Sequence, residues 1–174
     1  YGPKIDLKIK DSLGREWQMT TIQFDFNMSE RFGLIFAAAD GSLQRPYMVH
    51  RALLGSLERF FGVLIEHYGG AFPVWLAPVQ VVAIPVAQPF SGYASSVASS
   101  LRSRDIRAEA YLGGERMNAK IRLAQEQKVP YMLILGEKER SAGSLSVRTR
   151  AGQVSSLTID KFVSLIHDRV KNLE

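Results

Sequence analysis

The chain begins with hydrophobic and polar residues in alternation, which is typical of half-buried β-strands. Residues 5–9 alternate apolar with charged side chains, and residues 17–26 are rich in β-branched and aromatic side chains. A turn sequence at residues 11–14 separates these two runs. The pattern predicts an antiparallel hairpin, in which Thr21 lies on one face of the second strand and Gln18 lies on the other.

A helical period follows this strand pattern. A short strand is predicted at residues 47–50, and apolar residues then recur every three or four positions from Leu53 to Tyr68. Gly69 and Gly70 provide the stop signal of that helix. Gly55 and Gly62 lie inside the predicted helix, where each costs about 1 kcal/mol relative to alanine. Their presence predicts close packing at both positions.

The pattern changes after residues 72–78, a stretch that breaks regular structure and marks a predicted boundary between domains 1–75 and 76–174. Beyond it we predict strands at 79–86, 107–111, 129–135 and an edge strand at 144–150, with helices at 91–104, 118–127 and from Thr158 to Leu173. Apolar strands interleaved with helices predict an α/β domain, whose largely parallel sheet is covered on both faces.

Composition sets the limits on these predictions. The 174 residues are 46% hydrophobic and 22% charged, which permits a sizeable core in one domain or two. The chain has no cysteine, so it offers no disulfide and no thiolate. We expect a cytoplasmic location. No apolar stretch approaches the roughly 20 residues that cross a bilayer, and no signal segment begins the chain, so we expect no membrane association.

The net charge of +5 is distributed unevenly. Residues 1–75 carry eight basic and eight acidic side chains, so residues 76–174 hold the whole positive excess. Because a basic surface attracts polyanions, we expect the second domain to have a nucleic-acid partner. Charge alone leaves a basic domain without such a partner as the plainer alternative.

Five polar side chains of the first domain are candidates for ligand binding: Gln18, Thr21, Gln23, His50 and Arg59. Arg59 is an isolated cation in an apolar helix, so it requires a carboxylate, a phosphate or an aromatic plane as its partner. A salt bridge to Glu58 or Glu66 is the plain alternative. His50 alone is most simply a satisfied structural histidine, because a metal ligand needs further ligands nearby.

Residues 50–60 resemble motif 3 of the class II aminoacyl-tRNA synthetases, in the form found in threonyl-tRNA synthetases. The resemblance extends over essentially the whole chain through residues 1–6, 17–26, 70–78, 129–134 and 147–150. It implies the last part of a class II antiparallel-sheet catalytic domain, followed by an anticodon-binding domain with a five-stranded mixed sheet.

The resemblance also implies roles for the five candidates. Arg59 is expected to stack on the adenine of ATP, with Gln18 and Thr21 lining the adenylate pocket and Gln23 close by. His50 matches the last of three zinc ligands. That zinc receives the amino and hydroxyl groups of threonine and rejects valine, whose methyl group cannot be a ligand.

The implied reaction activates threonine with ATP to threonyl-adenylate and then transfers it to tRNA(Thr). ATP, Mg²⁺ and Zn²⁺ are the implied cofactors, and the full-length enzyme is expected to be a homodimer. Motif 1, the motif 2 arginine and two zinc ligands of this family would precede Tyr1. We therefore expect this chain to be a fragment that does not complete the catalytic site alone.

The second domain has its own implied site. Glu139 falls at a position that accepts hydrogen bonds from an anticodon base, and Arg148 at one that contacts an anticodon nucleotide. Lys120 and Arg122 are expected to project from a helix toward phosphates. Gly113-Gly114 departs from the family, in which a polar pair reads the anticodon. A plain surface role for Glu139 and Arg148 is the alternative.

Two other classes of protein compete with a synthetase. A non-catalytic nucleic-acid-binding accessory protein, derived from a synthetase, is the main alternative. It would lack the upstream motif 2 arginine and zinc ligands. A nucleotide-binding module without RNA is disfavoured, because no glycine-rich phosphate loop follows a strand.

Overall fold

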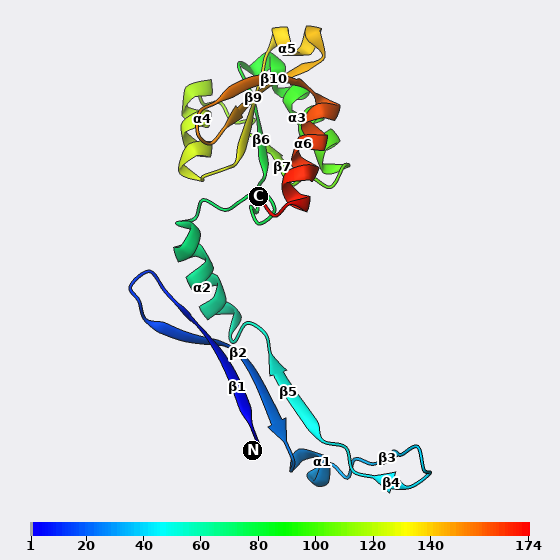
Figure 1. Ribbon diagram of the computed structural model, residues 1–174. Helices are drawn as coiled ribbons and strands as arrows, with labels where there is room; N and C mark the ends of the chain where they lie inside the picture. Colours follow the sequence, from blue (N-terminus) through cyan, green and yellow to red (C-terminus); the bar gives the residue numbers. More distant parts are fainter. Residues whose placement is uncertain (1) are drawn as a thin grey trace. The chain divides into compact units, whose positions relative to one another are not determined.

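The computed structural model describes residues 2–174, which form two compact units (Figure 1). The first unit ends at Gly69 and the second comprises Gly70–Glu174. Tyr1, with which the family resemblance begins, lies outside the described residues. Among the described residues, no helix has the length and apolar character needed to cross a membrane.

The first unit is built on a three-stranded antiparallel sheet in the order β1-β2-β5. Its strands are β1 Lys4–Lys10, β2 Glu16–Asp25 and β5 Met48–Ala52. The predicted hairpin of β1 and β2 is therefore confirmed. Its turn is fixed by the carboxylate of Asp11, which accepts backbone hydrogen bonds from Leu13 and Arg15.

An irregularity in β2 changes which side chains share a face. Thr20 and Gln18 pair with consecutive residues of β1, so Met19 is left as an extra residue and forms a β-bulge. A bulge shifts the alternation of side chains by one position. Gln18 therefore lies on the same face as Thr21, and the prediction that the two occupy opposite faces is wrong.

Helix α2 spans Leu57–Tyr68 and begins later than the apolar period predicted. Gly55 has φ +66°, and a Cβ there would lie 3.2 Å from a carbonyl oxygen of β2, so close packing is confirmed at this glycine. Ser56 then caps the helix, whose end lies at Gly69 with φ 54°. A Cβ added at Gly62 would meet no neighbouring atom within 4 Å, so the close packing predicted there is wrong.

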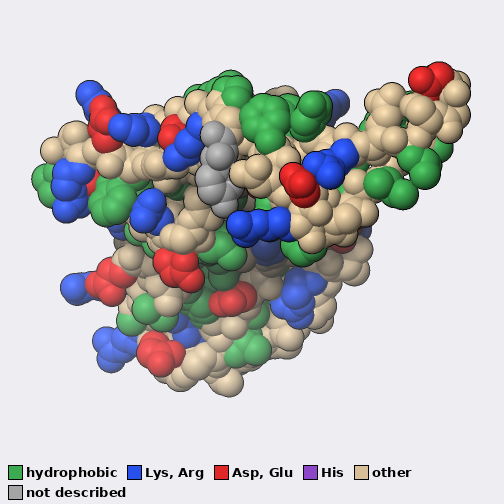
Figure 2. All heavy atoms as spheres, turned by 90° about the horizontal axis from the view of Figure 1, so that it is seen from below, with side chains coloured by type: hydrophobic (Ala, Val, Ile, Leu, Met, Phe, Trp, Pro, Cys, Tyr) green, Lys and Arg blue, Asp and Glu red, His purple; other side chains and the backbone are tan. Residues whose placement is uncertain are grey.

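The connection between β2 and β5 is formed by short elements with apolar surfaces. Helix α1 spans Met28–Arg31, and strands β3 Phe36–Ala37 and β4 Leu43–Gln44 form a small hairpin. Phe36 and Leu43 are exposed, and Figure 2 shows hydrophobic side chains along this projecting hairpin. The first unit therefore leaves substantial apolar surface uncovered.

The second unit contains a five-stranded mixed sheet in the order β10-β9-β8-β6-β7, as predicted. The strands are β6 Val81–Pro85, β7 Ala108–Ala110, β8 Tyr131–Leu135, β9 Ser144–Thr149 and β10 Val154–Thr158. Strands β7, β6 and β8 are parallel, whereas β9 is antiparallel to both of its neighbours. The strand predicted at the edge, β9, is therefore internal, because β10 covers it.

Helices cover both faces of this sheet, as Figure 1 shows. The helical elements of this unit are the 3-10 turn Gln88–Phe90, α3 Ser91–Arg102, α4 Met117–Glu126, α5 Glu137–Ala142 and α6 Ile159–Lys171. One core packs Leu101 of α3 and Phe162 of α6 against the sheet, and a second core includes Ala124 of α4. Thr158 caps α6, as predicted.

The segment that precedes β6 is bound to the second unit through its carbonyl oxygens. Arg107 donates hydrogen bonds of 2.8 Å to the carbonyls of Ala77 and Trp75. Arg150 donates a 3.1 Å hydrogen bond to the carbonyl of Phe72. These contacts place residues 70–75 with the second unit, whereas the sequence pattern assigned them to the first.

Candidate functional site

The polar face of the β1-β2-β5 sheet carries a connected group of side chains. The Gln18 amide donates hydrogen bonds of 2.7 Å to the Asp6 carboxylate and to the Thr21 hydroxyl. The Thr21 hydroxyl in turn donates to Asp6 at 2.8 Å. Lys4 lies 2.9 Å from Asp6 and, with Thr21, lowers the pKa of this carboxyl. Asp6 therefore fixes the two side chains that the sequence singled out.

Gln23 and His50 lie on the same polar face, because they are directly opposed in the antiparallel pair of β2 and β5. His50 Nε2 lies 2.9 Å from Oδ2 of Asp25, which is buried. The other carboxylate oxygen accepts backbone hydrogen bonds from Asn27 and Met28. The hydrogen bond from His50, with those from the backbone, lowers the pKa of Asp25 to about 2. Asp25 therefore fixes one edge of the His50 ring.

A zinc site needs more ligands than these residues supply. Catalytic zinc is held by three protein ligands, and the described residues contain no group of three or more histidine, cysteine, aspartate or glutamate side chains arranged to hold a metal. His50 and Asp25 form a pair only. Residues 2–174 therefore do not fit a complete zinc centre by themselves.

Arg59 meets an aromatic plane. Its Cζ lies 5.3 Å from the centroid of the Trp17 ring, within the range of a cation–π contact. Its Nη1 donates a 3.2 Å hydrogen bond to the backbone carbonyl of Gln18. These contacts replace the salt bridge to Glu58 or Glu66 that the sequence left open. Arg59 remains exposed to solvent.

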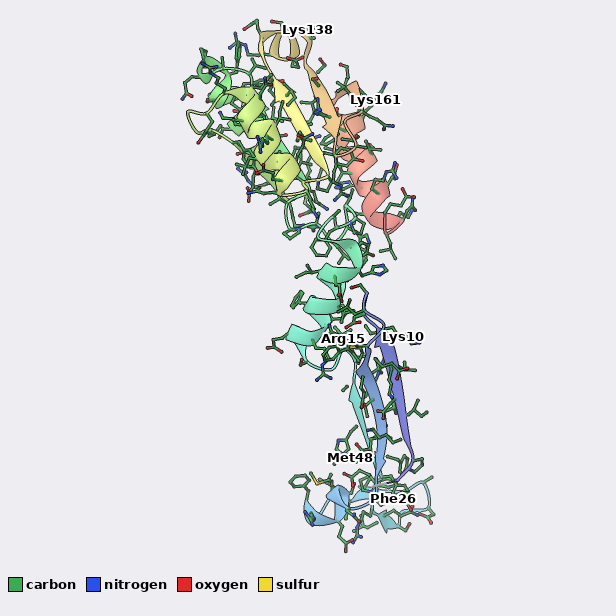
Figure 3. The ribbon with its side chains drawn as sticks, turned by 90° about the vertical axis from the view of Figure 1, so that its left-hand side faces the viewer. Lys10, Arg15, Phe26, Met48, Lys138 and Lys161 are labelled. Carbon is green, nitrogen blue, oxygen red and sulfur yellow. The ribbon has the colours of Figure 1, made fainter. Side chains whose placement is uncertain are left out.

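Trp17 is itself held in place by a carboxylate. Its Nε1 donates a 2.9 Å hydrogen bond to Oδ2 of Asp11, which also accepts a 2.7 Å hydrogen bond from Arg15 Nε. The hydrogen bond from Trp17, with those from Arg15, lowers the pKa of Asp11 to about 2. Figure 3 shows Arg15 beside α2, where Arg15, Trp17 and Arg59 line a hollow of about 430 Å³. Trp17 was not among the predicted site residues, although the isolation of Arg59 indicated an aromatic or anionic partner.

The pKa of Asp11 predicts a specific acid sensitivity. Because its pKa in the fold lies below the ordinary value of about 4, the ionised carboxylate stabilises the fold above about pH 4. That stabilisation is lost as the pH falls toward about 2. We expect Asp11→Asn to lower the Tm at neutral pH and to make the acid decrease of Tm shallower. Thermal unfolding followed by circular dichroism tests this, and a variant with the wild-type acid profile would contradict it.

The second unit places Glu139 and Arg148 at different ends of one strand pair. Glu139 lies in the first turn of α5 and accepts a 3.0 Å hydrogen bond from the backbone of Gly136. Arg148 on β9 pairs with Met132, near the start of β8, whereas α5 follows the end of β8. Glu139 and Arg148 therefore lie near opposite ends of β8 and do not form a single site. Arg148 Nε is buried without a hydrogen-bond partner within the described part of the chain, so its hydrogen-bonding capacity is unsatisfied there.

The two basic residues of α4 differ in exposure. Arg122 is exposed and forms a 2.9 Å salt bridge with Glu126, one turn away. Lys120 is only 5% exposed, so the prediction that it projects from the surface is wrong. It lies one turn from the buried Ala124, on the face of α4 that packs against the sheet. Arg122 therefore projects from the surface of α4, whereas Lys120 does not.

Two protein families match successive parts of the chain. The family described as "Anticodon binding domain" matches residues 80–169, more than half of the chain. The family described as "tRNA synthetase class II core domain (G, H, P, S and T)" matches residues 1–68. These matches coincide with the mixed-sheet unit and the antiparallel-sheet unit.

Individual relatives agree with the family matches. The threonine–tRNA ligase of Borrelia hermsii is 56% identical over 178 residues, and that of Aquifex aeolicus is 50% identical over 175 residues. Both alignments cover 100% of this chain but only 30% and 27% of those relatives. The crystal structure of the RNA binding domain of threonyl-tRNA synthetase from Cryptosporidium parvum matches with a TM-score of 0.89 at 35% identity, covering 97% of this chain and 43% of that one. The chain therefore belongs to the threonyl-tRNA synthetase family and comprises a segment of the class II core domain followed by an anticodon-binding domain.

Proposed function

We propose that this chain acts as part of a threonine–tRNA ligase, which activates threonine with ATP and transfers it from threonyl-adenylate to tRNA(Thr). The observation that carries the proposal is the polar face of the β1-β2-β5 sheet. There, Gln18, Thr21, Gln23 and His50 lie together, with Arg59 bonded to the backbone of the same strand. The identity of the chain to threonine–tRNA ligases supports this reading.

Each of these five residues has a proposed role. Arg59 stacks on the adenine of ATP, because a planar guanidinium binds aromatic faces and remains charged. Gln18 and Thr21 donate and accept hydrogen bonds in the adenylate pocket, where Asp6 has already fixed their side chains. Gln23 and His50 lie opposite each other on β2 and β5, and this part of the polar face is proposed to bind threonine.

Formation of threonyl-adenylate is phosphate chemistry: the threonine carboxylate forms a bond to the α-phosphorus of ATP, and pyrophosphate leaves. Such chemistry depends on positioning and on neutralisation of negative charge by arginine and Mg²⁺. His50 is proposed as one zinc ligand, and the remaining ligands must come from other segments. Its hydrogen bond with Asp25 fits this role, because ligating histidines usually bond a carboxylate through their second ring nitrogen.

The second unit is proposed to bind the anticodon loop of tRNA(Thr). Glu139 accepts a hydrogen bond from a base edge, and the half-buried Arg148 contacts a nucleotide with its guanidinium. Arg122 contributes a phosphate contact, which positions the RNA without reading its sequence. Because Lys120 is buried, it is not included in this surface.

The proposed function is tested by ATP–pyrophosphate exchange with the full-length protein that contains this chain. Exchange should depend on threonine and should be far weaker with valine. A full-length protein that binds tRNA but supports no threonine-dependent exchange would instead be the non-catalytic accessory protein considered above.

The zinc assignment makes opposite predictions for two forms of the protein. The 174-residue chain should bind no zinc at micromolar affinity, because its described residues lack a three-ligand group. In the full-length enzyme, His50→Ala should lower the zinc content and impair threonine activation. Elemental analysis measures both zinc contents. Stoichiometric zinc on the isolated chain, or a normal zinc content in the His50 variant, would contradict the assignment.

A further inference from the structure

We propose that Trp17, oriented by Asp11, is a positioning residue that holds the Arg59 guanidinium for ATP. This inference rests on the proposed function, in which Arg59 contacts the adenine. Neither Trp17 nor Asp11 lies beside the side chains of Gln18 and Thr21. We therefore infer that they affect ATP binding only through the position of Arg59. The ring supplies one flat surface on which the guanidinium lies, 5.3 Å from the ring centroid.

The indole is well suited to this role because its orientation is fixed. Asp11 accepts the hydrogen bond of the Trp17 ring and is itself bound by the backbone N–H groups of Leu13 and Arg15. Asp11 is also buried. The same carboxylate therefore closes the β1-β2 turn and sets the plane of the indole. With its low pKa, Asp11 remains an ionised acceptor at neutral pH.

Arg59 needs such a support because it is a long side chain exposed on the surface of α2. Its other side-chain contact within the described residues is a single 3.2 Å hydrogen bond to the Gln18 carbonyl. One such bond does not fix the plane of a guanidinium. The indole restricts that plane, and the loss of side-chain freedom then occurs on folding rather than on nucleotide binding.

The two contacts of Arg59 also connect the two faces of β2. Trp17 and Gln18 are consecutive strand residues, so their side chains point to opposite faces. Arg59 lies against the ring of Trp17 and bonds the backbone of Gln18, whose side chain lies on the polar face. A displaced indole would therefore move Arg59 relative to the adenylate pocket.

A double-mutant cycle in the full-length enzyme tests this role. Trp17→Ala should raise the KM for ATP about tenfold, the cost of one partly exposed cation–π contact, and should leave the KM for threonine unchanged. Trp17→Phe should recover most of the loss, because it restores an aromatic plane. Glu16→Ala is the matched control: this neighbouring side chain is exposed and bonds only Lys8 in the described structure, so its KM values should remain at wild type.

The cycle is completed by the Trp17→Ala, Arg59→Ala double variant. If Trp17 acts through Arg59, the KM for ATP of the double variant should be no higher than that of Arg59→Ala alone. Additive effects of the two substitutions would overturn the positioning role. An equal rise in the KM for threonine would also overturn it, because that result indicates general damage to the sheet.

A measurement on the 174-residue chain separates this inference from the proposed function. The indole ring current should shift the NMR resonance of Arg59 Nε–H, and Trp17→Ala should abolish the shift. If Arg59→Ala leaves ATP kinetics unchanged while the shift is present, the proposed function of Arg59 is wrong although the contact exists. If the shift is absent, the positioning role is wrong whatever the kinetics of Arg59→Ala.

Discussion

Arg59→Ala in the full-length synthetase is expected to reduce kcat/KM for ATP about 30-fold, the equivalent of about 2 kcal/mol for a partly desolvated cation–π contact. The fold should be preserved, because Arg59 is exposed and forms no salt bridge in the described structure. The loss should appear in adenylate formation, the step in which the adenine is held.

Pyrophosphate exchange kinetics measure this effect directly. Arg51→Ala is the matched control, because Arg51 is exposed on β5 and lies on the opposite face of the strand from His50. Its kinetics should remain within about twofold of wild type, as is usual for surface substitutions. If Arg59→Ala also retains a wild-type kcat and KM for ATP, Arg59 has only a structural contact with Trp17.

Glu139→Ala is expected to weaken binding of the cognate anticodon loop by about 1–3 kcal/mol, the value of one base-edge contact. A loop with an altered anticodon should lose much less, because it does not form that contact. Both loops should bind more weakly as salt rises, since phosphate contacts release counterions. The ratio of the two affinities therefore isolates base reading from the general attraction of a basic domain.

Glu139 also caps α5, so the experiment needs variants that separate the two roles. Glu139→Gln retains a capping side chain but replaces a carboxylate acceptor with an amide. Glu137→Ala removes a neighbouring carboxylate that instead pairs with Arg140. Arg122→Ala should weaken both loops about equally. If Glu139→Ala and Glu139→Gln leave the affinity ratio unchanged, the domain is a general RNA clamp.

The sequence predicted the elements whose apolar patterns are clear. Alternation across residues 5–9 identified β1, and the apolar runs of β6 and β8 identified the centre of the mixed sheet. Strand β10 was missed because Val154–Thr158 is mostly polar, and α5 was missed because it has only six residues. Hydrophobic periodicity has little to detect in segments of this kind.

The candidate site was only partly predictable, because single residues changed the geometry. The bulge at Met19 turns Gln18 toward Thr21, and no alternation pattern shows a one-residue insertion. Lys120 is buried because α4 packs the face that carries Ala124, although a lysine ordinarily favours the surface. The contact between Trp17 and Arg59 depends on how the start of α2 lies against β2, which the sequence pattern does not specify.

We propose that this chain belongs to an enzyme that attaches threonine to its tRNA, and charging of tRNA(Thr) by the full-length protein tests this function most directly. The assay compares tRNA(Thr) with the same tRNA carrying an altered anticodon, at fixed salt. We predict that threonine is attached to tRNA(Thr), and that the altered anticodon lowers kcat/KM by about tenfold or more, the cost of one lost base contact. A protein that attaches no threonine to either tRNA would contradict the proposed function.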